Sequence, residues 1–544
     1  MDVNVDVVVV GAGQAGLVAA VFAASRGMTT TLIEARDVLG GTAAKSSGVM
    51  WIPNNRFMRQ HGVSDPRDDA LRYMARLATP RHYSSTHPTL GLADWELDSA
   101  GVFYDHASRA LDSLIDIGAL DVVYDPTFVD YYAHLPENVA PYGRTVFPRP
   151  GHGKATGGKA ATDILADRAA ALGVSILTKS HVVDVLVDDG AVVSVISEDN
   201  EGRRTKFNVG GGVIFTTGGF SRNPTMMRQN VALPYGPGCA VATNTGGFVP
   251  IAQRLGAQFD GMDKVWAAPI VFERTLREPE AVCASFYLPG DGFLITDLRG
   301  RRVVDEKAPY NDFTKAFFDF DWQGARYPAI PMIMIWDADH AQIHAGSRLG
   351  NPVPPADVDG YWVVEGADLN ELAQRVEERL ASLAAELPQA TLDPNFATTL
   401  ASTIGRFNHQ AADGVDEDFG RGATTYEQQM ALRMGPGKGT NPTLRPLAEN
   451  GPYYATLLTP AAFDTKGGPR IDEHARVVDV AGQPIEGLYA AGNCAASPTG
   501  ESYWSGGASL ALAMCFGYLA AEHSTQRAAE RAAQQNHEEA RIAN

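Results

Sequence analysis

The sequence predicts an α/β protein with a doubly wound, mostly parallel sheet and an inserted α+β domain. Three observations predict this class. A β-branched strand near the N-terminus runs directly into a glycine-rich turn and a helix. Two later strands of similar composition also end on glycines, near residues 218 and 492. A long segment of different composition, richer in proline and aromatic residues, separates those two strands.

The first βαβ unit occupies the first 34 residues. The run DVVVV at residues 6–10 is typical of a strand buried on both faces of a parallel sheet. The turn GAGQAG follows at residues 11–16, and a small-residue helix is expected over residues 17–25. A second strand over residues 29–33 ends at Glu34. This order of strand, GxGxxG turn, helix, strand and acid is the fingerprint of dinucleotide binding.

Each feature of that fingerprint has a physical reason. Gly11 permits the tight turn, and Gly13 lets the backbone approach a pyrophosphate. Gly16 lets the helix pack closely on the strand. The pyrophosphate is expected at the helix N-terminus, where unpaired N–H groups and the helix dipole favour an anion. Glu34 is expected to accept hydrogen bonds from a ribose.

Two later strands are expected to join the same layer, over residues 209–220 and 485–493. The segment between them suggests an insertion, and the Ala-, Gln-, Glu- and Arg-rich C-terminus suggests a solvated helix or tail. The predicted partition is a first part of the dinucleotide-binding domain, a catalytic domain, a return to the first domain, and a helical tail, at residues 1–276, 277–440, 441–524 and 525–544.

Composition excludes several classes of protein. The 544 residues include 45 Lys and Arg against 64 Asp and Glu, a net charge of −19, which argues against nucleic acid as a partner. The four cysteines are too scattered for a disulfide framework or a zinc site. The N-terminus lacks the pattern of a signal peptide, and the apolar stretch 508–521 is too short to span a bilayer. A cytoplasmic protein without a transmembrane segment is expected.

Three motifs together resemble the flavoprotein family that contains fumarate reductases, succinate dehydrogenase flavoprotein subunits and 3-ketosteroid dehydrogenases. GGTAAKSSG at residues 40–48 resembles the family's first flavin segment. GVIFTTGGF at 212–220 resembles the second, and GLYAAGN at 487–493 the third. The resemblance covers nearly the whole chain and implies FAD as the cofactor, bound in a Rossmann-like domain assembled from both ends of the chain.

The resemblance also implies which residues contact FAD. No histidine lies in the 40–48 loop and the nearest is His61, so non-covalent binding is expected. The backbone of Val183 is expected to meet the adenine, and the start of the last helix is expected to face the pyrimidine end of the flavin. The full expected set is Gly11, Gly13, Ala15, Gly16, Glu34, Gly41, Thr42, Ser46, Ser47, Gly48, Val183, Thr217, Gly218, Gly492, Asn493, Ser509 and Leu510.

The C-terminal motif indicates a branch of this family. GESYWSGG at residues 500–507 resembles the GxxYPGxG segment of the 3-ketosteroid dehydrogenases, with Tyr503 and Gly507 at matched positions. VVDEKAPY, ending at Tyr310, resembles a segment that carries a catalytic tyrosine. A third tyrosine comes from VDYY, where Tyr131 is preferred to Tyr132 only because it follows an aspartate.

The implied chemistry is the desaturation of a cyclic ketone, either a 3-ketosteroid or a smaller cyclohexanone. The α-hydrogen leaves as a proton and the β-hydrogen as a hydride to flavin N5. A phenol and a backbone N–H stabilise the enolate oxygen without burying a net charge, and Tyr503 and the Gly507 amide match these roles. Tyr310 is the expected base, assisted by Tyr131. The acceptor that reoxidises the flavin is unknown, and a quinone is one candidate.

Trp504 departs from the family pattern, which has proline there. Two interpretations stay open. The indole fills part of the cavity that a four-ring steroid would occupy, which favours a smaller ketone, or it points away into the protein.

An alternative function is a fumarate-reductase-like enzyme that reduces an activated C=C bond. Such enzymes clamp two carboxylates with Arg and His, and no Lys or Arg occurs from residue 477 to 526. Arg302 or Arg326 could supply a clamp. A flavin-binding subunit without its own substrate site and a flavin oxygenase are further alternatives. Lys466, in a glycine turn, is assigned a structural role.

Overall fold

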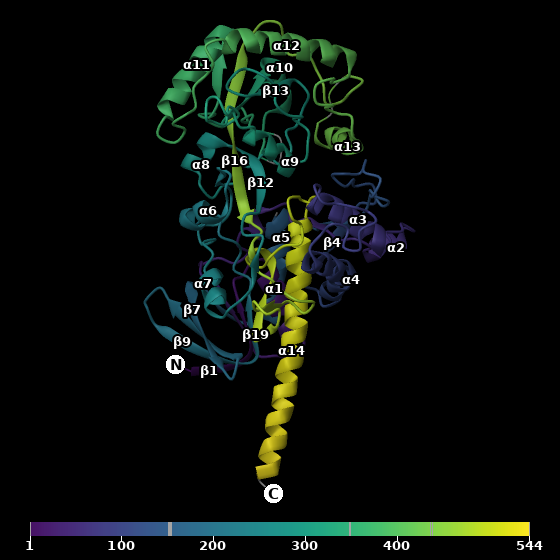
Figure 1. Ribbon diagram of the computed structural model, residues 1–544, viewed down its shortest axis with the longest axis vertical. Coiled ribbons are helices and arrows are strands. Elements are labelled where there is room, and N and C mark those ends of the chain that lie inside the picture. The colour runs from purple at the N-terminus through teal and green to yellow at the C-terminus, as the bar shows by residue number, and fades with distance from the viewer. Residues whose placement is uncertain (1, 151–154, 347–349, 436, 438, 543–544) are drawn as a thin grey trace. The chain divides into compact units, whose positions relative to one another are not determined.

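A computed structural model describes residues 2–150, 155–346, 350–435, 437 and 439–542 (Figure 1). The chain forms two compact units. Unit 1 contains residues 1–232, 240–265 and 464–544, and unit 2 contains residues 233–239 and 266–463. Unit 2 is longer at both ends than the segment 277–440 expected from composition. The reason is that the strands containing residues 265–271 and 453–465 pair with each other in its sheet.

Unit 1 is built on an eight-stranded sheet whose main path runs β18-β19-β9-β1-β2-β6. Neighbours along this path are parallel except β18 and β19. The strands β7 and β8 extend β9 as an antiparallel meander. The bounds are β1 (Asp2–Val10), β2 (Thr30–Ile33), β6 (Ser175–Leu177), β7 (Ser180–Asp188), β8 (Ala191–Asp199), β9 (Arg204–Phe215), β18 (Arg476–Val478) and β19 (Pro484–Ala490).

Strand β1 lies inside the sheet, between β2 and β9. Its last four valines, Val7 to Val10, are buried and pair on one side with β2 and on the other with β9. The strand β19 then pairs with β9, so the C-terminal segment completes the layer that the N-terminal segment begins. The predicted α/β class with a doubly wound parallel sheet is confirmed. The strands end earlier than expected, β9 at Phe215 and β19 at Ala490, because the residues beyond them form glycine turns.

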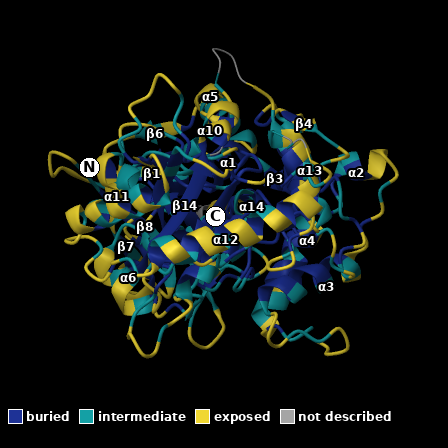
Figure 2. Cartoon of the chain, turned by 90° about the horizontal axis from the view of Figure 1, so that it is seen from above, coloured by how far each residue is buried: buried dark blue, intermediate teal, exposed yellow. Residues whose placement is uncertain are grey.

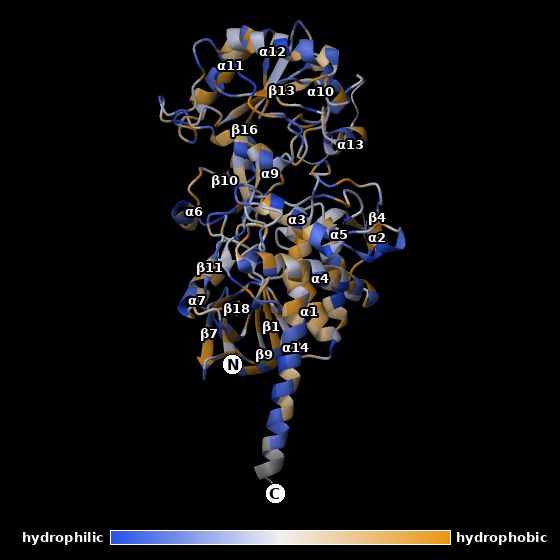
Figure 3. Cartoon of the chain, turned by 45° about the vertical axis from the view of Figure 1, so that its right-hand side comes forward, coloured by the Kyte–Doolittle hydropathy of each residue, from blue (hydrophilic) through white to orange (hydrophobic). Residues whose placement is uncertain are grey.

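Helices cover this sheet, and two of them pack closely together. The first, α1, spans Gln14–Ser25, and the last, α14, spans Ala508–Ile542. A Cβ on Gly517 of α14 would lie 2.6 Å from the Ala15 carbonyl oxygen, so only glycine permits this approach. α14 continues without a break past residue 525, and Figure 3 shows hydrophilic residues along its C-terminal half.

Short elements complete unit 1. A three-stranded sheet has the order β3-β5-β4, and β11 pairs with β17. Their bounds, with those of the remaining helices, are η1 (Ala43–Lys45), β3 (Met50–Trp51), α2 (Arg56–Gln60), α3 (Arg67–Ala78), α4 (Asp94–Asp116), β4 (Val122–Tyr124), β5 (Thr145–Pro148), α5 (Gly157–Ala171), α6 (Pro224–Asn230), α7 (Phe248–Arg254), β11 (Phe259–Asp260), β17 (Gly468–Pro469) and η4 (Gly492–Cys494).

Unit 2 is a six-stranded sheet with helices, in which β16 pairs with four other strands. Its elements are β10 (Gly236–Pro237), β12 (Val265–Val271), α8 (Phe272–Arg277), β13 (Phe293–Thr296), α9 (Tyr310–Phe313), η3 (Thr314–Phe318), β14 (Met332–Asp337), α10 (Ala338–His344), β15 (Val364–Gly366), α11 (Leu369–Ser382), α12 (Phe396–Asp413), α13 (Thr425–Met434) and β16 (Tyr453–Thr465), whose last two residues belong to unit 1.

Alternation along β14 produces two hydrophobic clusters in unit 2. Ile333 and Ile335 face one cluster, which α11 and α12 cover. Met334 and Trp336 face the other. Figure 2 shows the corresponding stripe on α12, with one face buried and the opposite face exposed. Among the described helices, none combines the length and apolar character needed to cross a membrane.

Candidate active site

The glycine turn after β1 leaves one side of the backbone open. A Cβ on Gly16 would lie 1.9 Å from the Gly11 carbonyl oxygen, and one on Gly11 would lie 2.6 Å from the Thr216 carbonyl oxygen. Both positions therefore require glycine for packing. At Gly13 a Cβ would meet no atom within 4 Å. The backbone at Gly13 thus borders open space at the N-terminus of α1.

The N-terminus of α1 has features that favour the binding of an anion. Gly13 is its N-cap, the cap has no side-chain hydrogen bond, and the first turn contains no acidic residue. Gly41 lies opposite, and a Cβ on it would lie 3.7 Å from the Gly13 Cα. Unpaired N–H groups and the helix dipole therefore face a glycine-lined space.

Glu34 stands at the end of β2 and is buried. Its Oε2 accepts a hydrogen bond from the Ala12 amide at 2.7 Å, and its Oε1 accepts one from the Arg36 amide at 2.8 Å. These bonds fix the carboxylate beside the glycine turn. Each carboxylate oxygen keeps a second lone pair that can accept a hydrogen bond from a hydroxyl group.

The loop over residues 40–48 uses its hydroxyls mainly for its own conformation. Thr42 Oγ1 accepts from the Val241 amide at 3.2 Å. Ser46 Oγ donates to the Ala43 carbonyl and accepts from the Gly48 amide at 3.0 Å. Ser47 is exposed in the same turn. These contacts order the loop next to α1.

A buried aspartate joins the second and third glycine turns. Asp464 accepts from the side chains of Asn244 and Asn493, at 2.7 and 2.6 Å, and a longer bond comes from the Gly219 amide. Burial raises the pKa of Asp464, while the two amide donors oppose that shift. Nearby, Thr217 Oγ1 is buried without a hydrogen-bond partner among the described residues. Gly218 packs on Asn244.

The remaining expected cofactor residues lie in three places. Val183 is 37% exposed on β7, at a register shift between Val182 and Asp184 where its backbone does not pair with β8. Gly492 begins η4, and Ala15 is in the first turn of α1. Ser509 and Leu510 are in the first turn of α14.

Three of the four predicted catalytic groups lie together before and at the start of α14. The Gly507 amide donates to Tyr503 Oη at 3.1 Å, and Tyr503 Oη is also 3.1 Å from Ser509 Oγ. The Tyr131 and Tyr503 ring centroids are 6.1 Å apart. A Cβ on Gly506 would lie 2.8 Å from Tyr131 Oη, so this hydroxyl lies directly against the backbone that follows Tyr503.

The fourth predicted group, Tyr310, belongs to unit 2. It begins α9 and is buried against Phe286 and Phe463, with ring centroids 5.0 and 6.2 Å away. Tyr132, the alternative to Tyr131, lies with its ring centroid 6.5 Å from that of Tyr131.

Two buried cations hold the segments that carry these tyrosines. Lys466 Nζ donates to the carbonyls of Gly500 and Ser502, immediately before Tyr503. Arg144, fully buried, binds the carboxylates of Asp65 and Asp130.

Asp130 precedes Tyr131 and also accepts from Trp51 Nε1 at 2.9 Å. Burial raises the pKa of Asp130 to about 6, while Arg144 opposes the shift. The Tyr131 amide in turn donates to Ser505 Oγ. This network therefore connects the Tyr131 and Tyr503 segments.

Trp504 points into the protein. Its side chain is fully buried, with ring centroids 6.0 Å from Trp51 and 5.7 Å from Phe103. Its carbonyl accepts from Tyr73 Oη at 2.7 Å. The structure therefore favours the second of the two interpretations of this residue, and Trp504 is no argument for a smaller substrate.

The arginines considered for a carboxylate clamp are already paired. Arg302 is nearly buried, and its guanidinium binds both Glu306 and Asp416. Arg326 lies 3.9 Å from Asp321. The positive charge of Arg302 is already balanced by two carboxylates of the protein, which disfavours the fumarate-reductase-like alternative.

Comparisons with known proteins show the family of the chain. Residues 6–510 match the family described as FAD binding domain. The chain belongs to this FAD-binding family.

The named relatives include ketone dehydrogenases of two kinds, together with two enzymes named as an NADH:acrylate oxidoreductase and a vinyl phenol reductase. A 3-oxosteroid 1-dehydrogenase of Mycolicibacterium smegmatis is 28% identical over 95% of this chain and 96% of its own length. A 4-oxocyclohexanecarboxylate 2-dehydrogenase of Sinomonas cyclohexanicum is 30% identical over 95% and 92%. Among solved structures, a 3-ketosteroid Δ1-dehydrogenase from Sterolibacterium denitrificans has the same fold, with a TM-score of 0.81 at 24% identity over 96% of this chain and 99% of that one.

These findings confirm the predicted family, the flavoprotein oxidoreductase class and FAD as the cofactor. The observed site fits FAD, because open space adjoins Gly13, α1 has an uncapped N-terminus, and Glu34 stands at the end of β2. The absence of a covalent link to FAD stays a prediction. Sequence reasoning missed Asp464, whose partners Asn244 and Asn493 lie far from it in the chain, and it gave Arg144 no role of its own.

Replacing Gly13 with alanine tests the open space directly. The apoprotein should fold normally, because the new Cβ meets no protein atom and Gly13 has an extended backbone that any residue adopts. FAD should bind at least about tenfold more weakly, as the methyl group occupies the space for the pyrophosphate. Flavin fluorescence titration measures this. Gly405→Ala, at an equally open glycine in α12, is the control, and equal FAD affinity in both variants would contradict the assignment.

Replacing Arg144 with leucine tests the buried charge network. The change leaves two buried carboxylates without their cation, so the free energy of unfolding should fall by about 3–5 kcal/mol. Arg149→Leu removes an exposed ion pair with Asp121 and should change the free energy of unfolding by less than about 1 kcal/mol. Urea unfolding followed by circular dichroism measures both. A similarly small loss of unfolding free energy in the two variants would show that the Arg144 network contributes little to stability.

Proposed function

We propose that this chain is an FAD-dependent dehydrogenase that introduces a C=C bond next to the carbonyl group of a cyclic ketone. The observation that carries the proposal is the cluster of the Tyr503 hydroxyl, the Gly507 amide and the Tyr131 hydroxyl at the start of α14. Both groups of ketone dehydrogenases among the relatives act, by name, on oxo-substituted rings. One group acts on steroids and the other on a one-ring acid, so the substrate is proposed only as a cyclic ketone.

The roles of the residues follow from the charges that develop. As the α-proton leaves, negative charge accumulates on the ketone oxygen. The Tyr503 hydroxyl can donate to an oxygen placed beside it, and the Gly507 N–H, whose nitrogen is 3.1 Å from the phenol oxygen that it contacts, can share its one hydrogen with that oxygen. In the structure the amide donates to the phenol oxygen, which polarises the hydroxyl and makes it a stronger donor.

The proton and the hydride leave to different groups. We assign the α-proton to Tyr310 as general base, with Tyr131 beside Tyr503 assisting. FAD supplies the acceptor for the β-hydride at N5, so the ketone is oxidised to an enone and the flavin is reduced by two electrons. A separate electron acceptor, for which we propose a quinone-like molecule, must then reoxidise the flavin.

Neutral donors at this site suit a ketone better than a dicarboxylate. Among the described residues, the cluster around Tyr503 contains hydroxyls and amides, while the nearby Lys466 and Arg144 are buried and bound to carbonyls and carboxylates. A fumarate-type substrate would leave two charges without guanidinium partners.

Anaerobic flavin bleaching tests the proposed function. The purified yellow protein is mixed with a saturated 3-ketosteroid, with 4-oxocyclohexanecarboxylate or with succinate, and the oxidised-flavin absorbance is followed. A ketone should bleach the flavin and yield a product with conjugated-enone absorbance. Bleaching by succinate alone would mean that the tyrosine cluster has been misassigned.

Tyr503→Phe tests the oxyanion role. Loss of the hydroxyl should lower kcat by about 10²- to 10³-fold, with a smaller change in KM, because the donor acts mainly in the transition state. The flavin content should be unchanged. Tyr518→Phe removes a hydroxyl that bonds Ser113 and Glu522 and serves as the control. Equal activity of Tyr503→Phe and Tyr518→Phe would refute the role of Tyr503.

A further inference from the structure

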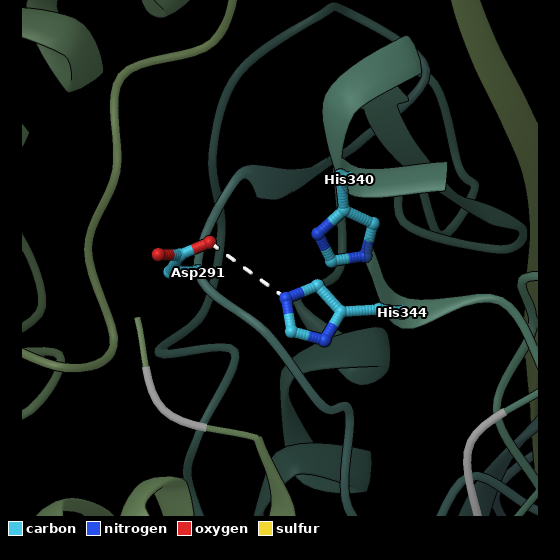
Figure 4. A group of neighbouring side chains, drawn as sticks. All are labelled: Asp291, His340 and His344. Atoms are coloured by element: carbon cyan, nitrogen blue, oxygen red, sulfur yellow. Dashed lines mark ion pairs between the residues drawn. The ribbon is translucent and has the colours of Figure 1, made fainter. Parts of the chain in front are cut away.

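Two histidines and an aspartate converge inside unit 2, and none of them belongs to the residues assigned above (Figure 4). His340 and His344 lie on α10, and Asp291 lies two residues before β13. All three are buried, and one ligand atom from each lies within 4.8 Å of the others. Histidines four residues apart share one face of a helix, which is the spacing of a two-histidine metal site.

The hydrogen bonding of His340 is the independent sign of a missing ligand. Its side chain is fully buried, yet neither Nδ1 nor Nε2 has a hydrogen-bond partner among the described residues. Buried polar atoms are nearly always paired, because leaving them unpaired is costly.

The local packing holds the three groups toward one another. A Cβ on Gly290 would lie 2.4 Å from His344 Cδ2 and 2.6 Å from His340 Cε1, so glycine at this position makes room for both imidazoles. Gly290 also has a φ of +83°, which favours glycine. The loop that carries Asp291 thus lies directly against the histidine face of α10.

Asp291 already has the kind of partner that orients a metal-binding carboxylate. Arg445 Nε donates to Asp291 Oδ1 at 3.3 Å, while its terminal nitrogens are held by Asp337. His344 Nε2 is 4.0 Å from the same Asp291 oxygen. Bonds of about 2.0–2.1 Å in a tetrahedron would bring such atoms to roughly 3.4 Å apart, so ligand atoms that now lie up to 4.8 Å apart would have to move closer together around the ion.

Charges of both signs surround the cluster, since the Asp291 carboxylate faces His344 while the cationic side chains of Lys307 and Arg445 act on both imidazoles. A network of ion pairs and charge interactions includes four cationic side chains and six carboxylates. The cations are Arg302, Lys307, Arg421 and Arg445, and the carboxylates are Asp291, Asp305, Glu306, Asp337, Asp416 and Glu427. Burial and the Glu427 charge raise the pKa of Asp305 to about 7, so a proton on it still leaves an excess of negative charge.

We propose that Asp291, His340 and His344 form a binding site for one Zn²⁺ ion, with a fourth position left for water. Two imidazoles and a carboxylate are a donor set that zinc accepts and that Mg²⁺, which prefers oxygen ligands, does not. The ion would join the loop before β13 to α10 and satisfy the ring nitrogens of His340. This site is independent of the flavin chemistry proposed above.

The experiment uses the full-length flavoprotein, treated with a chelator and then titrated with Zn²⁺ or Mg²⁺ at constant pH. Isothermal titration calorimetry and elemental analysis measure affinity and stoichiometry. Asp291→Asn and His344→Gln remove one ligand each, and both are used because His340 is the most deeply buried of the three. His409→Gln, which alters an exposed histidine beside Asp413, is the matched control.

We expect one Zn²⁺ per chain, a higher melting temperature with zinc, and no such effect of Mg²⁺. Asp291→Asn and His344→Gln should each weaken zinc binding at least tenfold, while His409→Gln should not. X-ray absorption at the zinc edge should show two imidazole ligands. Failure to bind zinc, or equal affinity in all three variants, would overturn the proposal, and neither result would bear on the ketone dehydrogenase activity.

Discussion

Everything in unit 1 depends on how α1 is packed while its N-terminus stays open. The helix must lie against β1 and β9 closely enough that Gly16 has no room for a Cβ, yet the backbone at Gly13 must border free space. On its other side, α14 approaches through Gly517. The N-terminal dipole of α1 is therefore directed at a space that the protein does not fill, and FAD supplies the negative charge that belongs there.

The same packing determines where the tyrosine cluster lies. β19 pairs with β9 and leads into the third glycine turn, and the segment with Tyr503 connects that turn to α14. Lys466 and Arg144 then hold this segment and the Tyr131 segment through buried bonds. Because a buried charge is costly unless it is fully paired, these networks fix their loops in one arrangement. The donors that face a ketone can then remain neutral.

The sequence allowed the first βαβ unit, FAD and the family to be predicted, because local residue patterns determine a strand, a glycine turn and a helix N-terminus. The bounds of unit 2 could not be predicted, since they follow from the pairing of β12 with β16, which are far apart in the chain. Asp464 escaped notice for a similar reason, as its partners Asn244 and Asn493 come from distant segments.

The orientation of Trp504 also depends on contacts that only the fold creates. Its partners Trp51 and Phe103 come from the first fifth of the chain, so its position after Tyr503 gave no sign of which way the ring points. His340 and His344 show the helical spacing in the sequence, but Asp291 joins them only through the loop before β13. Sequence patterns thus do not determine which residues from distant segments come into contact in the core.

The most direct test of the central claim is a deuterium isotope effect on flavin reduction. Stopped-flow absorbance is recorded under anaerobic conditions with a cyclic ketone that turns over, unlabelled and then deuterated at its β-carbon. If the β-hydrogen is transferred to the flavin, reduction should slow severalfold with the labelled ketone, and the product should carry a C=C bond conjugated to the carbonyl. Flavin reduction without an isotope effect at the β-carbon and without an enone product would contradict the account.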